Sequence, residues 1–124
     1  MSNTDNLLFS KDDVWIREIG DEVDLGVSEH AADSVGDVQY VGVVDMGTNL
    51  RVGDEIGKVR GPNDHFIVLS PVAGTVVALN EEVIEDASIL NEDPYGEGWL
   101  IRVDLEDELS DDFMKWDEYS ELVG

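Results

Sequence analysis

The sequence predicts a mainly β domain, a sandwich or barrel, with short peripheral helices and one C-terminal helix. Short β-rich runs are separated by turn-forming residues along most of the chain, as is typical of this fold class. The 124 residues are the length of one domain, and 42% of them are hydrophobic, which is enough to bury a core. We expect residues 1–10 to form a flexible lead and residues 11–124 to form a single domain.

The strands are predicted from runs of β-branched and aromatic residues bounded by turn signals. The expected strands are residues 14–18, 22–27, 38–44, 54–60, 65–69, 74–79 and 99–103. Residues 49–53 are turn-like. The strongest turn is Gly61-Pro62-Asn63-Asp64, because proline presets φ and Asn or Asp tolerates the left-handed region. We therefore expect a hairpin with its tip at Pro62 and Asn63.

The helices are predicted from capping residues and from helical spacing. Ser28 can cap a short helix that runs to about residue 32 and closes at Gly36, and Asn80 can cap a helical turn over residues 81–86. Ser110 is the expected N-cap of the C-terminal helix, with two aspartates in a first turn where the helix dipole favours negative charge. Spacings of three and four predict that one face of this helix packs on the core: Phe113, Trp116, Tyr119 and Val123.

The charge of the chain excludes several classes of partner. Seven Lys and Arg against 30 Asp and Glu give a net charge of −23, so we expect no binding to nucleic acid or to anionic membranes. The chain has no cysteine, which excludes disulfides, thiolate zinc sites and cysteine nucleophiles. No apolar run reaches the roughly 18 residues of a membrane helix, and no signal-peptide pattern is present, so we expect a cytoplasmic protein.

The acidity itself has two interpretations. It can form a docking face for basic partners, or it can be a general solvated surface, including one adapted to high salt. The acidic residues are spread along the whole chain and lysine occurs only three times, as Lys11, Lys58 and Lys115, which favours the solvated surface. In either case, self-repulsion predicts that stability depends on ionic strength.

The residue chemistry does not indicate a catalytic centre. The two histidines, His30 and His65, are not paired in sequence with a serine nucleophile, and we interpret both as surface residues. No calcium-loop spacing is present, and Gly96-Glu97-Gly98 lacks the third glycine and the strand-to-helix setting of a phosphate-binding loop. We therefore expect no metal site and no enzyme, but a carrier or binding module.

Three segments resemble a known family. The run Gly53-Asp54-Glu55-Ile56-Gly57 and the run of residues 70–76, Ser-Pro-Val-Ala-Gly-Thr-Val, resemble the biotinyl and lipoyl carrier domains. Residues 90–100, Leu-Asn-Glu-Asp-Pro-Tyr-Gly-Glu-Gly-Trp-Leu, are more specific and resemble the H-protein of the glycine cleavage system. The resemblance covers nearly the whole chain.

This resemblance implies a flattened barrel-sandwich hybrid of two sheets, like a lipoyl domain, with a lipoylated lysine at a hairpin tip. The lipoyl arm of such proteins carries an aminomethyl group from glycine decarboxylase to an aminomethyltransferase and is reoxidised by dihydrolipoyl dehydrogenase. A flexible arm on a rigid hairpin can visit several active sites at high effective concentration. The implied partners are these three enzymes and a lipoate-attaching enzyme, and we expect the chain to be a monomer.

The sequence departs from the family at the tip. H-proteins typically read Glu-Ser-Val-Lys-Ala around the modified lysine, and counting from either flanking motif places that lysine at position 63. Position 63 is Asn63, and the five corresponding residues are Arg60, Gly61, Pro62, Asn63 and Asp64, followed by His65. Asn63 has no amine to acylate, so we expect no cofactor, unless lipoate is attached to Lys58 or another lysine.

Two functional hypotheses follow from this departure. The first is a non-lipoylated H-protein relative with a binding or regulatory role. The second is a working lipoyl carrier of the glycine cleavage system, with Lys58 as an unfavourable attachment site because it lies within a strand. The segment that resembles the family signature can be a structural loop or a partner-facing surface, and its candidate contact residues are Asn91, Glu92, Asp93 and Tyr95.

Overall fold

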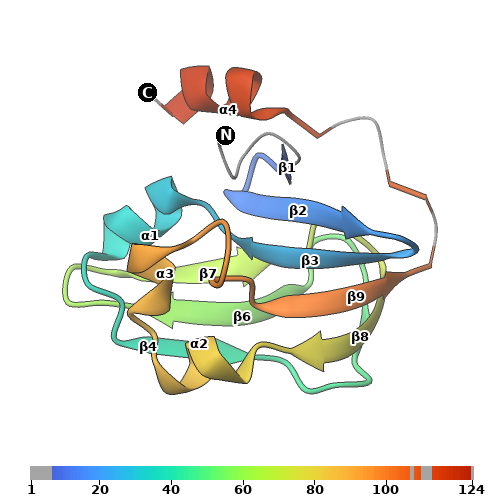
Figure 1. Cartoon of the computed structure of the whole chain (residues 1–124), viewed down its shortest axis with the longest axis horizontal. Coiled ribbons are helices and arrows are strands. Elements are labelled where there is room, and N and C mark those ends of the chain that lie inside the picture. The colour runs from blue at the N-terminus through green and yellow to red at the C-terminus, as the bar shows by residue number, and fades with distance from the viewer. Residues whose placement is uncertain (1–6, 107, 110–112, 124) are drawn as a thin grey trace.

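The structure, a computed structural model, describes residues 7–106, 108–109 and 113–123 (Figure 1). These residues form nine strands and four helices. In chain order the elements are β1 (Leu7–Phe9), β2 (Val14–Ile19), β3 (Glu22–Val27), α1 (Glu29–Val35), β4 (Tyr40–Val43), β5 (Asn49–Leu50), β6 (Glu55–Arg60), β7 (His65–Leu69), β8 (Gly74–Leu79), α2 (Glu81–Glu85), α3 (Ile89–Glu92), β9 (Ile101–Leu105) and α4 (Trp116–Val123).

The strands form two open sheets. One has six strands in the order β1-β2-β3-β9-β8-β5, and the other has three in the order β4-β6-β7. All the strand pairs are antiparallel. The three short helices α1, α2 and α3 gather at one end of the molecule, and α4 lies against β1 (Figure 1). This arrangement confirms the predicted mainly β fold with two sheets, short peripheral helices and a C-terminal helix.

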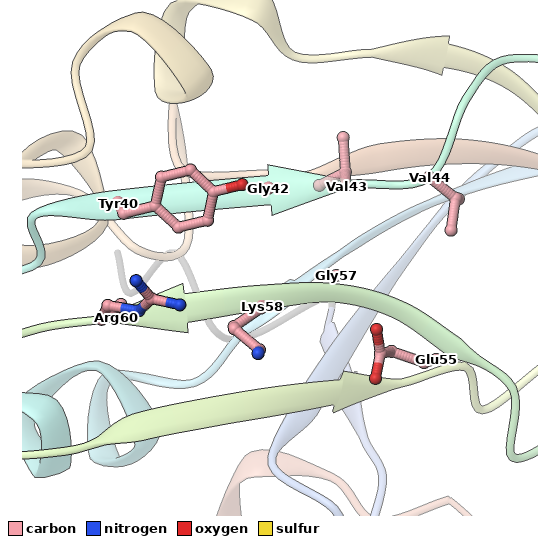
Figure 2. A pocket seen from close by; sticks show the side chains of 8 residues that line it. All are labelled: Tyr40, Gly42, Val43, Val44, Glu55, Gly57, Lys58 and Arg60. Atoms are coloured by element: carbon pink, nitrogen blue, oxygen red, sulfur yellow. The ribbon is translucent and has the colours of Figure 1, made fainter.

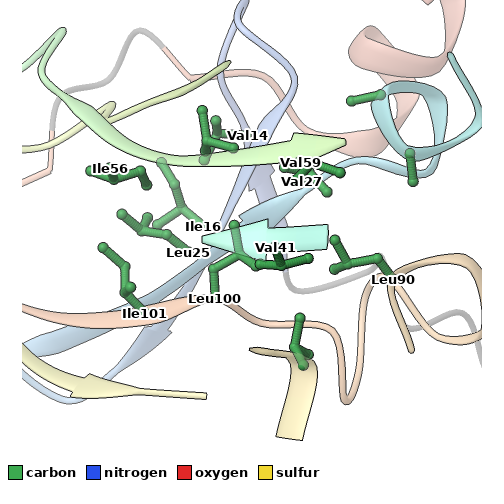
Figure 3. Packing of buried hydrophobic residues seen from close by; sticks show 14 of the residues in the cluster. Val14, Ile16, Leu25, Val27, Val41, Ile56, Val59, Leu90, Leu100 and Ile101 are labelled. Atoms are coloured by element: carbon green, nitrogen blue, oxygen red, sulfur yellow. The ribbon is translucent and has the colours of Figure 1, made fainter. Parts of the chain in front are cut away.

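The core lies between the two sheets because each strand turns alternate side chains inward. Ile16, Leu25 and Ile101 stand opposite one another on three neighbouring strands of the larger sheet, and all three are fully buried. Val41 and Val59 approach them from the smaller sheet (Figure 3). Burying each such side chain contributes about 1.5–3 kcal/mol, so this layer fixes the two sheets relative to each other.

A second, aromatic cluster attaches α4 to the outside of the larger sheet. The rings of Phe9 and Tyr119 are stacked, with their centroids 4.5 Å apart, and Trp116 packs at an angle beside them. The Tyr119 hydroxyl donates to the Asp13 carboxylate and lies 2.7 Å from Ser28 Oγ. Burial is the main reason that the pKa of Tyr119 is raised. The hydroxyl therefore remains neutral and joins the N-terminal and C-terminal segments of the domain.

The structure corrects two boundaries drawn from the sequence. The expected lead, residues 1–10, was too long, because Leu7–Phe9 forms β1 and Phe9 is fully buried. Leu7 and Phe9, at alternate positions of this segment, are buried in the aromatic cluster outside the larger sheet, and the segment pairs with β2. Residues 49–53 were expected to be a turn, but Asn49–Leu50 forms β5 and pairs with β8.

The predicted helix caps had mixed outcomes. Ser28 is confirmed as the N-cap of α1, since its Oγ accepts a hydrogen bond from the Ala31 amide at 3.2 Å. Asn80 precedes α2 as predicted, but its side chain makes no cap hydrogen bond. Instead the Asn80 amide donates to the carbonyls of Glu97 and Trp99, both at 2.7 Å. This asparagine therefore joins the start of α2 to the loop before β9.

The aromatic residues of the predicted C-terminal packing face belong to two different clusters. Ser110, the predicted N-cap, lies outside the described residues, and α4 begins at Trp116. Trp116 and Tyr119 belong to the aromatic cluster, whereas Phe113 precedes the helix and packs against the main core. The predicted packing role is thus seen for these three aromatic residues, although they do not share one helix face.

Candidate functional site

The β6–β7 hairpin presents position 63, where the family pattern predicts a carrier lysine. Arg60 and His65 form the last register pair of the hairpin, and the backbone N–H of Gly61 donates to the Asp64 carbonyl at 3.0 Å. The tip therefore consists of residues 61–64, as predicted from its proline and asparagine. The side chains of Pro62, Asn63 and Asp64 are exposed.

The tip is held against the C-terminal end of α1. The Asn63 backbone N–H donates to the Val35 carbonyl at 3.2 Å. A Cβ at Gly61 would collide with the same carbonyl oxygen, so glycine is required for this close approach. Gly36, which ends α1, has a φ of +83° and lies directly beneath the Asn63 side chain. Both the tip and the end of the helix thus depend on a glycine at their contact.

Asn91 secures the segment beneath the tip. Its Oδ1 accepts a hydrogen bond from the Val38 N–H at 2.7 Å, and its Nδ2 donates to the Gly36 carbonyl at 3.1 Å. Asn91 therefore fixes the backbone of residues 36–38. The preceding residue, Val35, accepts the hydrogen bond from the Asn63 backbone. The family-like segment and the hairpin tip consequently lie at the same end of the molecule (Figure 1).

The other candidate contact residues have different environments. Tyr95 is 8% exposed, and its hydroxyl accepts from the Glu29 N–H at 2.9 Å. Burial raises the pKa of Tyr95. Asp93 is half-buried and accepts from the Glu97 N–H at 3.0 Å, whereas Glu92 is exposed. Of the four candidates, only the side chain of Glu92 is fully available to a partner, while Asn91, Asp93 and Tyr95 make internal hydrogen bonds.

Lys58 lies within β6 and not at the tip. It stands opposite Gly42 on β4 and Ile67 on β7, so it occupies the central strand of the smaller sheet. Its half-buried side chain lies on the outer face of that sheet, near Arg60 and Glu55 (Figure 2). An arm attached here would start from the face of the sheet.

The histidines do not form a recognisable catalytic arrangement. His65 Nδ1 lies 3.7 Å from Asp64 Oδ1, and both side chains are more than half exposed. His30 is exposed on α1. Within the described residues, no group of three or more His, Asp or Glu side chains is arranged to hold a metal ion.

Sequence reasoning missed a basic hollow on the outer face of the smaller sheet. Lys58 and Arg60 share this face because they are two residues apart on one strand, and Tyr40 joins them from β4. The signal was present in the sequence: two of only seven Lys and Arg residues stand two positions apart in a predicted strand.

Comparison with known proteins identifies the family. A family model described as "Glycine cleavage H-protein" matches residues 7–124. The chain belongs to the glycine cleavage H-protein family. H-proteins are carrier proteins and not enzymes, which agrees with the interpretation of the sequence.

Individual relatives support this assignment over nearly the whole chain. The glycine cleavage system H protein of Bifidobacterium longum is 37% identical over 119 residues, which cover 96% of this chain and 86% of that protein. The probable glycine cleavage system H protein of Haloarcula marismortui is 35% identical over 120 residues, covering 96% and 94%.

A solved structure shows the same fold. The crystal structure of a glycine cleavage system H protein from Mycobacterium marinum matches with a TM-score of 0.86 and 24% sequence identity, over 95% of this chain and 96% of that one. The two-sheet architecture is therefore that of an H-protein. In the described part of this chain, no helix has the length and apolar character needed to cross a membrane.

Proposed function

We propose that this chain is a non-lipoylated member of the H-protein family that acts as a binding or regulatory module. The observation that carries the proposal is Asn63 at the hairpin tip, where the family pattern has its modified lysine. Lipoate is attached through an amide bond to a primary amine. The carboxamide nitrogen of Asn63 is not nucleophilic, so this linkage cannot form at position 63.

The rest of the tip supports the same proposal. Arg60, Pro62 and Asp64 replace the glutamate, valine and alanine of the family pattern, so the tip differs in charge and in backbone freedom. Its contact with the Val35 carbonyl also restrains the backbone at Asn63. The scaffold of the carrier is retained, while the groups that an attaching enzyme would recognise are changed.

A working lipoyl carrier is the second candidate, because the relatives are named as ordinary glycine cleavage system H proteins. In that case a lysine away from the tip would carry the arm. Lys58 is in the middle of a three-stranded sheet, five positions before residue 63, while Lys11 and Lys115 are exposed near the ends of the chain. None of these lysines stands at the tip of the β6–β7 hairpin, where the family pattern has its modified lysine. Lys11 is exposed in the turn between β1 and β2, which is a different hairpin.

The proposed partners are proteins that recognise the H-protein scaffold. They are glycine decarboxylase, the aminomethyltransferase, dihydrolipoyl dehydrogenase or a lipoate-attaching enzyme, in the cytoplasm, with this chain as a monomer. The exposed tip, residues 62–64, and the exposed Glu92 lie at one end of the molecule and would form the contact surface. A scaffold without an arm can occupy such a surface without transferring a group.

The intact mass of the protein from its own source tests this proposal, together with peptide mapping across residues 51–70. We expect an unmodified mass. A lipoyl increment on Lys58, or on either other lysine, would overturn the proposal and establish the protein as a carrier.

A lipoate ligase assay in vitro tests the role of the tip. We expect Asn63→Lys to be modified only partly, because Pro62 and Asp64 also differ from the family pattern. Asn63→Arg has the same added charge but no acylatable amine, and is the matched control that should remain unmodified. Modification of the wild-type chain, or of the Asn63→Arg control, would locate the acceptor at another lysine and contradict the proposal.

A further inference from the structure

The outer face of the smaller sheet carries an unusual concentration of basic side chains. The strand register places Tyr40, Arg60 and His65 in one row across β4, β6 and β7. The next row consists of Gly42, Lys58 and Ile67. Since residues in register point to the same face of a sheet, the two cations of β6 stand side by side next to an exposed tyrosine.

The glycine of the second row turns this face into a hollow. Gly42 has no side chain opposite Lys58, and the Tyr40 ring extends over the position that a Cβ would fill. The resulting hollow has a volume of about 450 Å³ and is lined from β4 and β6, with Glu55 at one side (Figure 2). This volume is in the range of small-molecule sites.

The cations of the hollow are free to bind a ligand. In the described part of the chain, neither Lys58 nor Arg60 has a carboxylate within 4.0 Å. The Arg60 guanidinium lies over the Tyr40 ring, 5.5 Å from its centroid. A guanidinium held on a ring keeps its N–H edges available for two parallel hydrogen bonds to an oxyanion.

We propose that this hollow binds the carboxylate or phosphate group of a small molecule, with Arg60 and Lys58 as the cationic ligands and the Tyr40 ring as a platform for an attached planar group. The net charge of −23 disfavours extended polyanions such as nucleic acid, whereas a compact anion meets mainly the local positive field. Glu55 repels the ligand from one side and limits the charge that the hollow accepts. The site is independent of Asn63 and does not depend on the proposed loss of lipoylation.

The test is a titration of the isotopically labelled full chain, followed through its backbone amide NMR signals. The probes are inorganic phosphate, acetate and phenyl phosphate, at fixed pH and at a fixed ionic strength of about 0.15 M, where the Debye length is about 8 Å. We expect saturable shifts centred on residues 40–43 and 57–60. Saturation by phosphate alone identifies a phosphate ligand, and saturation by acetate a carboxylate. No saturable shift at these residues with any of the three probes would overturn the proposal.

Matched variants separate the site from general electrostatics. Lys58→Gln and Arg60→Gln should each weaken binding about tenfold or more, because each removes a charge-assisted hydrogen bond. Arg51→Gln removes the same charge from an exposed position elsewhere and should change the dissociation constant less than about twofold. Glu55→Gln should tighten binding. Equal losses in Arg51→Gln and Arg60→Gln would show a field effect without a site and would contradict the proposal.

The aromatic platform has its own readout. Phenyl phosphate should bind more tightly than inorganic phosphate to the wild-type chain, and Tyr40→Leu should remove that preference while phosphate still binds. If the preference is absent in the wild type or persists in Tyr40→Leu, Tyr40 is not the platform and that part of the proposal is wrong.

Discussion

The two sheets of this molecule use their basic residues differently. On the larger sheet, Arg17, Asp24 and Arg102 form one row across β2, β3 and β9. The Asp24 carboxylate is 1% exposed and accepts from Arg17 Nη2 at 3.0 Å and from Arg102 Nε at 2.7 Å. On the smaller sheet, Lys58 and Arg60 also share a face, but neither has a carboxylate partner among the described residues.

This difference distinguishes structural cations from cations that can bind a ligand. Arg17 and Arg102 also lie over the rings of Trp15 and Trp99, with centroid distances of 5.0 and 5.4 Å. The hydrogen bonds to Asp24 are the main reason that the pKa of Arg102 is raised. These two guanidinium groups are therefore committed to one buried carboxylate. The Arg60 guanidinium lies over the exposed Tyr40 ring and makes no side-chain hydrogen bond to the part of the chain that the structure describes, so its N–H groups are available to a ligand.

The largest loss of stability is expected from a change at Asp24, the buried carboxylate that pairs with both arginines of the larger sheet. Asp24→Asn should reduce the free energy of unfolding by about 3 kcal/mol, because it leaves two arginines over the sheet without a counter-charge. The partial exposure of both arginines keeps the loss toward the lower end of the range for buried pairs. Urea unfolding followed by circular dichroism measures the loss as a lower midpoint at an unchanged m-value.

Asp45→Asn is the matched control, because Asp45 is exposed and the substitution removes the same charge. It should change the free energy of unfolding by less than about 0.5 kcal/mol. If Asp24→Asn is no more destabilising than this control, the row on the larger sheet is not structural and the contrast between the sheets fails.

The larger sheet was predictable from the sequence, but its ion row was not. Runs of β-branched and aromatic residues predicted the two strands in residues 14–18 and 22–27, which pair with each other in the structure. Arg102, which reaches Asp24 from β9, is 78 positions away from it in the chain. Spacing along the sequence carries no information about which distant strand lies next to β3, so this pairing required the structure.

The next effect concerns the hydroxyl that joins the two ends of the chain on the larger sheet. Tyr119→Phe should lower the free energy of unfolding at neutral pH by about 1–2 kcal/mol, because it leaves the half-buried Asp13 carboxylate and the buried Ser28 hydroxyl without this partner. Equilibrium unfolding in urea at pH 7 measures the loss. Tyr40→Phe, at an exposed tyrosine on the smaller sheet, is the control and should change stability by less than about 0.5 kcal/mol.

The same hydroxyl predicts a dependence on alkaline pH. Burial raises the pKa of Tyr119 above its ordinary value of 10.0. Above pH 10 the unfolded chain therefore loses this proton while the folded protein keeps it, so the wild type loses stability as the pH rises. Tyr119→Phe lacks this contribution, and its stability deficit should shrink between pH 9 and pH 11. A deficit that stays constant over this interval would show that the hydroxyl is not protected in the folded state.

The candidate site was predictable only in part. The hairpin tip was located correctly because proline and asparagine fix a turn at residues 61–64 whatever lies around it. The contact of this tip with Val35, and the support from Asn91, depend on how α1 and α3 pack. Tyr95 is almost completely buried. The sequence left open whether its segment is a partner-facing surface or a structural loop, because burial depends on the same packing of distant elements.

The smallest effect on stability is expected at the smaller sheet, and a matched pair of double variants measures it. Lys58→Gln with Arg60→Gln, and Lys11→Gln with Arg51→Gln, each remove two positive charges from a chain of net charge −23. Both pairs should melt slightly below the wild type at low salt, because self-repulsion increases. Both should approach the wild type as the Debye length falls from roughly 30 Å to about 8 Å, and the wild type should itself become more stable over the same series.

Equal behaviour of the two double variants is the decisive result, since ionic strength screens general repulsion but not a specific contact within the fold. Differential scanning calorimetry at several salt concentrations provides the comparison. If the Lys58 and Arg60 variant remains less stable than its control at high salt, these residues stabilise the smaller sheet as Asp24 and its arginines stabilise the larger one. A wild-type melting temperature that does not change with salt would instead mean that bound cations or ion pairs already relieve the repulsion. If the two double variants instead behave alike and the wild type becomes more stable with salt, the basic face contributes little to folding. Lys58 and Arg60 are then available to bind a ligand.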